Sequence, residues 1–104
     1  MRTIIAGGRA YELTEVDRAW LDRIRARLPI TVVLSGAARG ADTGGAEWAA
    51  SRGIPVETWP ADWDRYGRAA GPRRNQEMVD RADALVPFPG TSGTDDVTRR
   101  AHAA

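Results

Sequence analysis

Four short apolar segments alternate with four helical segments along the chain, and this alternation restricts the possible folds most strongly. The apolar segments lie at residues 3–6, 30–34, 55–59 and 84–88. The first two are apolar throughout, which is typical of strands that are buried on both faces. We therefore predict an α/β fold, a three-layer sandwich in which helices cover both faces of a four-stranded parallel sheet. A chain of 104 residues is too short for two ordinary domains, so we expect one domain over residues 1–104.

The first helix shows both a start signal and an apolar face. Thr14 is expected to be its N-cap, with Asp17 completing a variant of the capping box. Apolar residues recur at intervals of three and four and predict the face that packs on the sheet. They are Leu13, Val16, Trp20, Ile24 and Leu28.

The later helices are marked by residues that favour helix ends. We expect a second helix through Glu47, Trp48 and Ala49, with Gly53 as the C′ residue just beyond its end. Pro72 is suited to the first position of the third helix, and Thr94 is expected to cap the last one. The dozen residues before Pro72 are predicted to be irregular.

The composition excludes several classes of enzyme. The chain has no Cys and no Lys, and all fifteen basic residues are Arg. Zinc-thiolate sites, thiolate nucleophiles, lysine Schiff bases and P-loop lysines are therefore excluded. Its single histidine, His102, cannot build a multi-histidine metal site, so we expect neither a metal ion nor a cofactor.

Charge and hydropathy bear on location and partners. There is no apolar run of about 18 residues and no secretory signal pattern, so we expect a cytoplasmic protein without a membrane partner. The formal net charge is only +1, which argues against nucleic acid as a partner.

Three of the four predicted strands end in glycine-containing loops, at residues 7–9, 35–40 and 89–94. Glycine lets backbone N–H groups approach an anion, and the start of the next helix adds partial positive charge. One such loop could simply be a tight turn. Three loops at the same edge of a parallel sheet, two of them with an arginine, favour a phosphate-bearing ligand there. None of the loops matches GxGxxG or the P-loop.

Arg73 and Arg74 follow Pro72 in the predicted first turn of a helix, where the helix dipole disfavours cations. Either an anionic ligand lies nearby, or the arginines pair with Glu77, which is three and four residues further on. The two explanations are compatible.

Several other residues have two interpretations. Asp95 and Asp96 are good helix-starting residues, but they could also accept hydrogen bonds from ribose hydroxyl groups. The same ambiguity applies to Asp42 and Glu47. Trp63 lies in the irregular stretch and could stack on a base or close the core.

Taken together, these loops resemble the YspA-type, YpsA-related branch of the SLOG superfamily. The resemblance runs from about Thr3 to Val97. The matching motifs are Gly7-Gly8-Arg9, Ser35-Gly36-x-Ala38-Arg39-Gly40-Ala41-Asp42, Pro60-Ala61-x-Trp63, Tyr66-Gly67, Ala70-Gly71-Pro72, Arg74-Asn75, Met78 and Phe88-x-Gly90-x-x-Gly93-Thr94. The resemblance implies a Rossmann-like fold with strand order 3-2-1-4 that binds nucleotides or nucleotide-derived ligands.

The same superfamily includes the LOG-type phosphoribohydrolases, and this chain departs from their signature. Arg74 matches the signature arginine, but Asn75 replaces its lysine and Thr91 replaces a glycine of the phosphate loop. Val97 stands at the position of the catalytic glutamate. Gly44 and Gly45 also depart from the residues expected there and should loosen the start of their helix.

The resemblance therefore favours a module that binds a nucleotide or an ADP-ribose-like ligand. A LOG-like N-glycosidase is the alternative, and single-stranded nucleic-acid binding is a second one. The candidate ligand-binding residues are Gly8, Arg9, Ser35, Gly36, Arg39, Asp42, Trp63, Arg74, Asn75, Gly90, Thr91, Ser92, Gly93 and Thr94.

Four tryptophans are more than so small a core readily hides. We therefore expect a homodimer or a higher homo-oligomer, because association buries additional apolar surface. The contact would use the helix that carries Val16, Trp20 and Ile24, or the helix that carries Trp48.

Overall fold

A computed structural model describes residues 1–8, 10–36, 41–90 and 92–103. Four strands form one sheet: β1 (Arg2–Ala6), β2 (Val32–Ser35), β3 (Val56–Thr58) and β4 (Ala84–Pro87). All three pairings are parallel and the order is β3-β2-β1-β4. The predicted α/β class and the strand order 3-2-1-4 are therefore confirmed.

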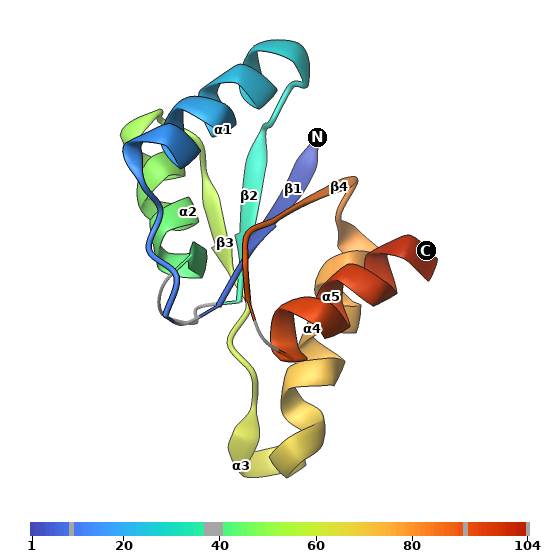
Figure 1. The fold of residues 1–104 in the computed structure, drawn as a ribbon. Helices are drawn as coiled ribbons and strands as arrows, with labels where there is room; N and C mark the ends of the chain where they lie inside the picture. Colours follow the sequence, from blue (N-terminus) through green and yellow to red (C-terminus); the bar gives the residue numbers. More distant parts are fainter. Residues whose placement is uncertain (9, 37–40, 91, 104) are drawn as a thin grey trace.

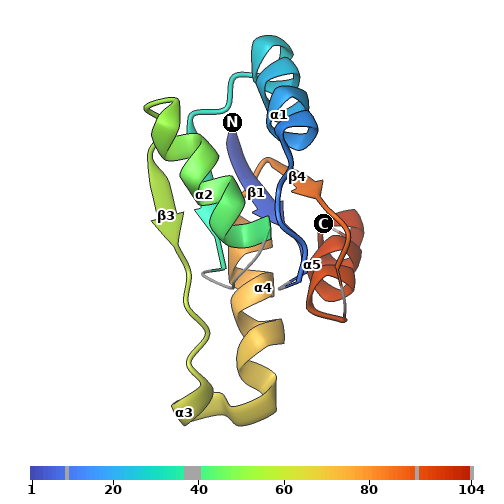
Figure 2. The same ribbon diagram turned by 60° about the vertical axis from the view of Figure 1, so that its left-hand side comes forward.

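Helices cover both faces of the sheet. α1 (Glu15–Arg27) and α2 (Ala41–Ser51) lie on one side, and α4 (Ala70–Arg81) and α5 (Ser92–Ala103) lie on the other (Figures 1 and 2). Successive residues of β1 face opposite sides of the sheet: Ile5 packs with α1 and α2, and Ile4 packs with α4 and α5. No helix among the described residues is long and apolar enough to cross a bilayer.

Between β3 and α4, the stretch expected to be irregular contains a short helix, α3 (Trp63–Tyr66), and a 3-10 turn, η1 (Gly67–Ala69). Asp62 caps α3 by accepting a hydrogen bond from the backbone N–H of Arg65 at 3.2 Å. This segment projects away from the sheet and lies at the bottom of Figure 1, beside the start of α4.

The capping box of α1 is present, but its predicted apolar face is largely wrong. Leu21 is fully buried in the core and Ile24 packs against it, whereas Val16 is 78% exposed and Trp20 54% exposed. The cause is geometric: residues four apart advance by about 40° around a helix of 3.6 residues per turn. The series from Val16 to Leu28 therefore winds around the helix, and only part of it faces the sheet.

Two helices begin earlier than predicted. The N-cap of α4 is Ala69, so Pro72 is its third residue, and Thr94 is the third residue of α5. Pro72 is tolerated because the N–H groups of a first turn have no acceptor within the helix. As a consequence Arg73 is the fourth and Arg74 the fifth residue of α4, so Arg74 lies beyond the first turn and the dipole argument for an anion no longer applies to it.

α2 is continuous, and its two glycines allow close packing. A Cβ on Gly45 would lie 2.6 Å from Cγ2 of Ile5, and a Cβ on Gly44 would lie 2.8 Å from Cγ of Leu13. The expected loosening is therefore replaced by a close approach of α2 to β1. The helix ends at Ser51, and Gly53 follows as the predicted C′ residue, with a φ of +70° that suits glycine.

Trp48 of α2 lies in the core and is 1% exposed. Its indole N–H donates a hydrogen bond to Oδ1 of Asp22 on α1 at 2.9 Å. Trp48 therefore cannot supply apolar surface for an interface between copies of the chain.

Candidate functional site

A cleft of about 800 Å³ lies at the carboxyl end of the sheet. Its floor comes from the end of β1, and one wall is formed by Gly7, Gly8 and Gly36. The other wall is formed by residues of α4 and α5, with Trp63 and Arg68 at the projecting α3–η1 segment. The strand order reverses between β1 and β4, because β2 and β3 are added on one side of β1 and β4 on the other. Open parallel sheets commonly bind ligands at such a point.

The cleft brings together half of the residues singled out from the sequence. These are Gly8, Gly36, Trp63, Arg74, Asn75, Gly93 and Thr94. Ser35 does not line the cleft; it is buried and pairs with Thr58 across the sheet. Arg9, Arg39 and Thr91, and the side chains of Asp42 and Ser92, lie outside the described residues.

Gly8 and Gly90 are glycines because two loops touch through their backbones. The N–H of Gly8 donates to the carbonyl of Pro89 at 2.9 Å. A Cβ on Gly8 would lie 2.9 Å from Cα of Gly90, and a Cβ on Gly90 would lie 2.2 Å from Oγ1 of Thr94. Gly90 therefore packs against Gly8, which lines the cleft, but Gly90 itself is not among the lining residues.

Arg74 holds the wall of the cleft together. Its guanidinium donates to the backbone carbonyl of Gly36, to that of Trp59 at 3.1 Å, and to Oδ1 of Asn75 at 2.9 Å. These bonds join α4 to the ends of β2 and β3. The ion pair with Glu77 that the spacing allows is not formed between the two described side chains.

Arg73 has a different environment. Its guanidinium carbon lies 4.0 Å from the centre of the Tyr66 ring, a cation–π contact that fixes α3 against α4. The side chain is directed to this contact, and it is not among the residues that line the cleft.

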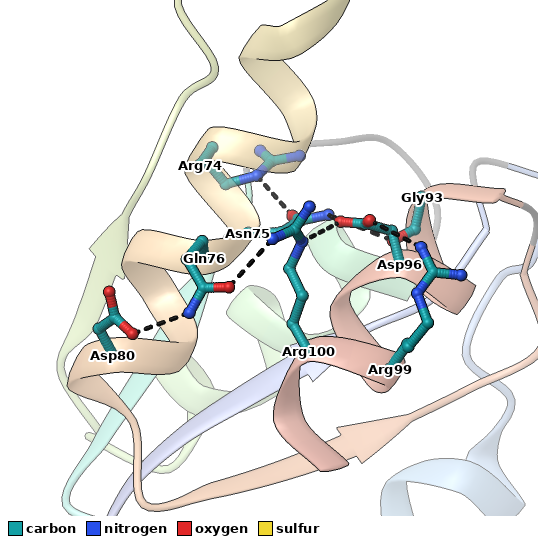
Figure 3. Close-up of polar contacts among 8 residues, drawn as sticks. All are labelled: Arg74, Asn75, Gln76, Asp80, Gly93, Asp96, Arg99 and Arg100. Atoms are coloured by element: carbon teal, nitrogen blue, oxygen red, sulfur yellow. Dashed lines mark hydrogen bonds and ion pairs between the residues drawn. The ribbon is translucent and has the colours of Figure 1, made fainter. Parts of the chain in front are cut away.

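Asn75 and Asp96 connect α4 with α5 (Figure 3). Nδ2 of the buried Asn75 donates to Oδ2 of Asp96 at 3.0 Å and to the carbonyl of Gly93 at 3.3 Å. Arg100 donates to the same Oδ2 at 2.8 Å and to Gln76, while Arg99 lies 3.1 Å from Oδ1. A polar network thus runs along the cleft wall formed by the two helices.

The Asp96 carboxyl is ionised in this network. Partial burial raises its pKa, but the hydrogen bonds from Arg100 and Asn75 and the two nearby arginine charges outweigh burial, so the pKa lies below its ordinary value. The side chain is 13% exposed and lines the cleft. At neutral pH it can only accept hydrogen bonds.

Comparison with known proteins bears on this architecture. The model of the YspA, cpYpsA-related SLOG family matches residues 1–66 of the chain. The chain belongs to this family. It is also 38% identical over 95 residues to the "Gene 61 protein" of Mycobacterium phage D29, a match that covers 85% of this chain and 76% of the phage protein. No solved structure matches it significantly.

The matched residues of this SLOG-family protein extend from β1 to α3. They include the glycine wall of the cleft and Trp63, and they end before Arg68. The wall formed by α4 and α5 lies beyond the matched residues.

Sequence reasoning did not select Arg68, Gly71 or Arg99 of this SLOG-family protein as site residues, although all three line the cleft. Helical spacing could have indicated Arg99, which lies one turn after Asp95 and Asp96. The sequence could not assign a role to Gly71, because that role is to leave room for the distant Trp63. A Cβ on Gly71 would lie 3.2 Å from Cη2 of the indole. Among the described residues, no three His, Asp or Glu side chains form a group that could hold a metal ion.

Proposed function

We propose that the cleft binds a nucleotide or a nucleotide-derived ligand such as an ADP-ribose-like compound. The observation that carries this proposal is the meeting, in one cleft of about 800 Å³, of an exposed indole, a free guanidinium and the first turn of α5. These features are suited to a base, a phosphate charge and phosphate oxygens, respectively. Membership of the SLOG family supports the same class of ligand.

Phosphate would be bound by the first turn of α5 and by Arg68. α5 has twelve residues, and the N–H groups at the start of such a helix are available to an anion. Arg68 forms no ion pair with any residue that the structure describes, so its charge remains available to a ligand. Gly93 offers open space on this turn, where a Cβ would meet nothing within 4 Å.

The base would stack on Trp63. Its indole is 55% exposed at the rim of the cleft and rests against the backbone of α4 at Gly71. Apolar side chains of Ile4, Met78 and Val97 line the cleft beneath. An aromatic ring beside an apolar floor favours a planar base.

Binding without glycosidic cleavage fits the site better than hydrolysis. Val97 is 2% exposed and belongs to the core, so the position of the LOG-type glutamate contributes packing instead of a carboxylate. The neighbouring Asp96 is ionised and tied to Arg100, which does not suit a proton donor. Chromatography after incubation with nucleoside monophosphates is expected to show no free base, and release of base would establish the enzyme instead.

Isothermal titration against mono-, di- and cyclic nucleotides and ADP-ribose tests binding. We expect Trp63→Leu to lower the affinity about tenfold or more, as loss of a stacked base does. Trp20→Leu is the matched control, because Trp20 is equally exposed but lies on α1. Arg68→Gln should weaken binding more than Arg23→Gln on α1. The proposal fails if the wild-type protein binds none of these compounds, or if the paired variants behave alike.

A further inference from the structure

One carboxylate is built into the cleft although the proposed ligand is itself an anion. Asp96 is largely enclosed, with a side chain 13% exposed, and is held between α4 and α5 by Asn75 and Arg100. The other acidic residue that lines the cleft, Asp95, is exposed and forms no ion pair with a described residue. Asp96 is therefore oriented by its surroundings, and Asp95 is not.

The two carboxylate oxygens of Asp96 differ in how many further hydrogen bonds they can accept. Oδ2 accepts from Nδ2 of Asn75 and Nε of Arg100, which uses both of its acceptor positions. Oδ1 accepts from Arg99 alone among the described residues, at 3.1 Å, and the Arg99 side chain is 74% exposed. One acceptor position on Oδ1 thus remains, and Asp96 lines the cleft. Figure 3 shows the bonds that Asn75, Arg99 and Arg100 donate to this carboxylate.

The position of Asp96 indicates which part of a nucleotide would meet this oxygen. Asp96 lies one turn after Gly93, on the helix whose start would bind the phosphate. The sugar is the part of a nucleotide that directly follows the phosphate, whereas the base lies further away, toward Trp63 in the proposed arrangement. An ionised carboxylate repels a phosphate and accepts strongly from a hydroxyl group.

We propose that Asp96 determines specificity for the sugar, accepting a hydrogen bond from a ribose hydroxyl group through Oδ1, so that ribonucleotides bind more tightly than deoxyribonucleotides. This proposal rests on the proposed function of the cleft. Asn75 and Arg100 are positioning residues in it, since they occupy Oδ2 and leave an acceptor position on Oδ1 of a side chain that lines the cleft.

Titration of the wild-type protein with ligand pairs is the direct test. The four ribonucleoside 5′-monophosphates are compared with their 2′-deoxy and 3′-deoxy counterparts. Removing the hydroxyl group that donates to Asp96 should lower the affinity about tenfold or more, because a hydrogen bond to a charged group is lost. Equal affinities for ribo, 2′-deoxy and 3′-deoxy forms would overturn the specificity and leave nucleotide binding intact. If neither these nucleotides nor the di- and cyclic nucleotides and ADP-ribose bind, the proposed function fails, and this proposal fails with it.

Asp96→Asn provides a second measurement. It should lower the affinity for the ribonucleotide toward that of its deoxy counterpart and abolish the difference between them. Asp80→Asn is the matched control, because Asp80 accepts from Gln76 in the same network but does not line the cleft. Persistence of the ribose preference in a folded Asp96→Asn protein would contradict the proposal. If that variant does not fold, the wild-type ligand pairs still decide the question.

Discussion

Thr3 buries a hydroxyl group in β1. The residue is 2% exposed, and Oγ1 has no hydrogen-bond partner among the described residues. Because a buried unpaired hydroxyl destabilises the native state, Thr3→Val should raise the free energy of unfolding by about 1 kcal/mol. Urea denaturation measures the change, and Thr58→Val at an exposed position of β3 should not reproduce it. Destabilisation by Thr3→Val would show that the hydroxyl is satisfied in solution.

Arg74 is expected to matter for stability as well as for any ligand. Three of its hydrogen-bond acceptors are groups of the protein, and two of these are main-chain carbonyls at the ends of β2 and β3. Arg74→Ala should lower the free energy of unfolding by about 1.5–3 kcal/mol, the range for hydrogen bonds to a charged group. Arg73→Ala, which removes the cation–π contact with Tyr66, should cost less in the same denaturation experiment. Equal losses would argue against the bracing role of Arg74.

At the scale of the helices, glycines in α2 and α5 should respond oppositely to the same substitution. Gly45→Ala places a methyl group 2.6 Å from Ile5, which is buried, and should destabilise the fold by about 1–3 kcal/mol. Gly93→Ala meets open space and should stabilise it by about 0.5–1 kcal/mol through helix propensity. Thermal unfolding followed by circular dichroism compares the two. Two shifts of the same sign would contradict the packing argument.

The elements of the fold were predictable because their signals are local. Alternating apolar and amphipathic segments indicated all four strands and four of the helices, and the capping box fixed the start of α1. Boundaries failed where tertiary packing decides: Pro72 and Thr94 favour helix starts, yet α4 begins two residues and α5 three residues before the predicted first residue. α3 was missed because four residues are too few to show a period.

The edge of the sheet that forms the cleft could be predicted, but the network in its wall could not. Glycine-containing loops after parallel strands indicate that edge directly. The bonds of Asn75 to Asp96 and of Arg74 to Gly36 join residues 21 and 38 positions apart. No local pattern carries such information, so the partner of each side chain depends on how α4 and α5 pack.

For the whole molecule, acid should destabilise the fold. Hydrogen bonds from Arg52 and Trp48 lower the pKa of Asp22, and the Arg2 guanidinium lowers the pKa of Glu57. The native state therefore holds fewer protons than the unfolded chain, so its stability is complete above about pH 5 and falls as pH drops through these lowered pKa values.

Thermal unfolding between pH 7 and pH 2.5 measures this dependence. The midpoint should change little down to about pH 5 and decrease progressively below it. Asp22→Asn removes one contributor and should make the acid decline shallower while lowering stability at pH 7. A midpoint that rises on acidification would contradict the assignment of these carboxylates.

Self-association is expected through α1. Val16 and Trp20 lie one turn apart and are exposed, whereas Trp48 is buried and is excluded as a contact. Sedimentation velocity at micromolar concentration should show a dimer or a larger species, and Trp20→Glu should convert it to the monomer. Trp63→Leu is the control and should leave assembly unchanged. A wild-type protein that sediments as one chain would refute this expectation.

The two walls of the cleft combine segments that are far apart in the sequence, since Gly7 and Gly8 follow β1 whereas the opposite wall includes α5. Contacts between segments so distant in sequence are slow to form, because a long loop must close before they become favourable. The cleft is therefore among the last features to be completed as the chain folds. The ligand that we propose for this cleft would hold the two walls together, so we expect it to slow unfolding of the finished protein without accelerating its folding.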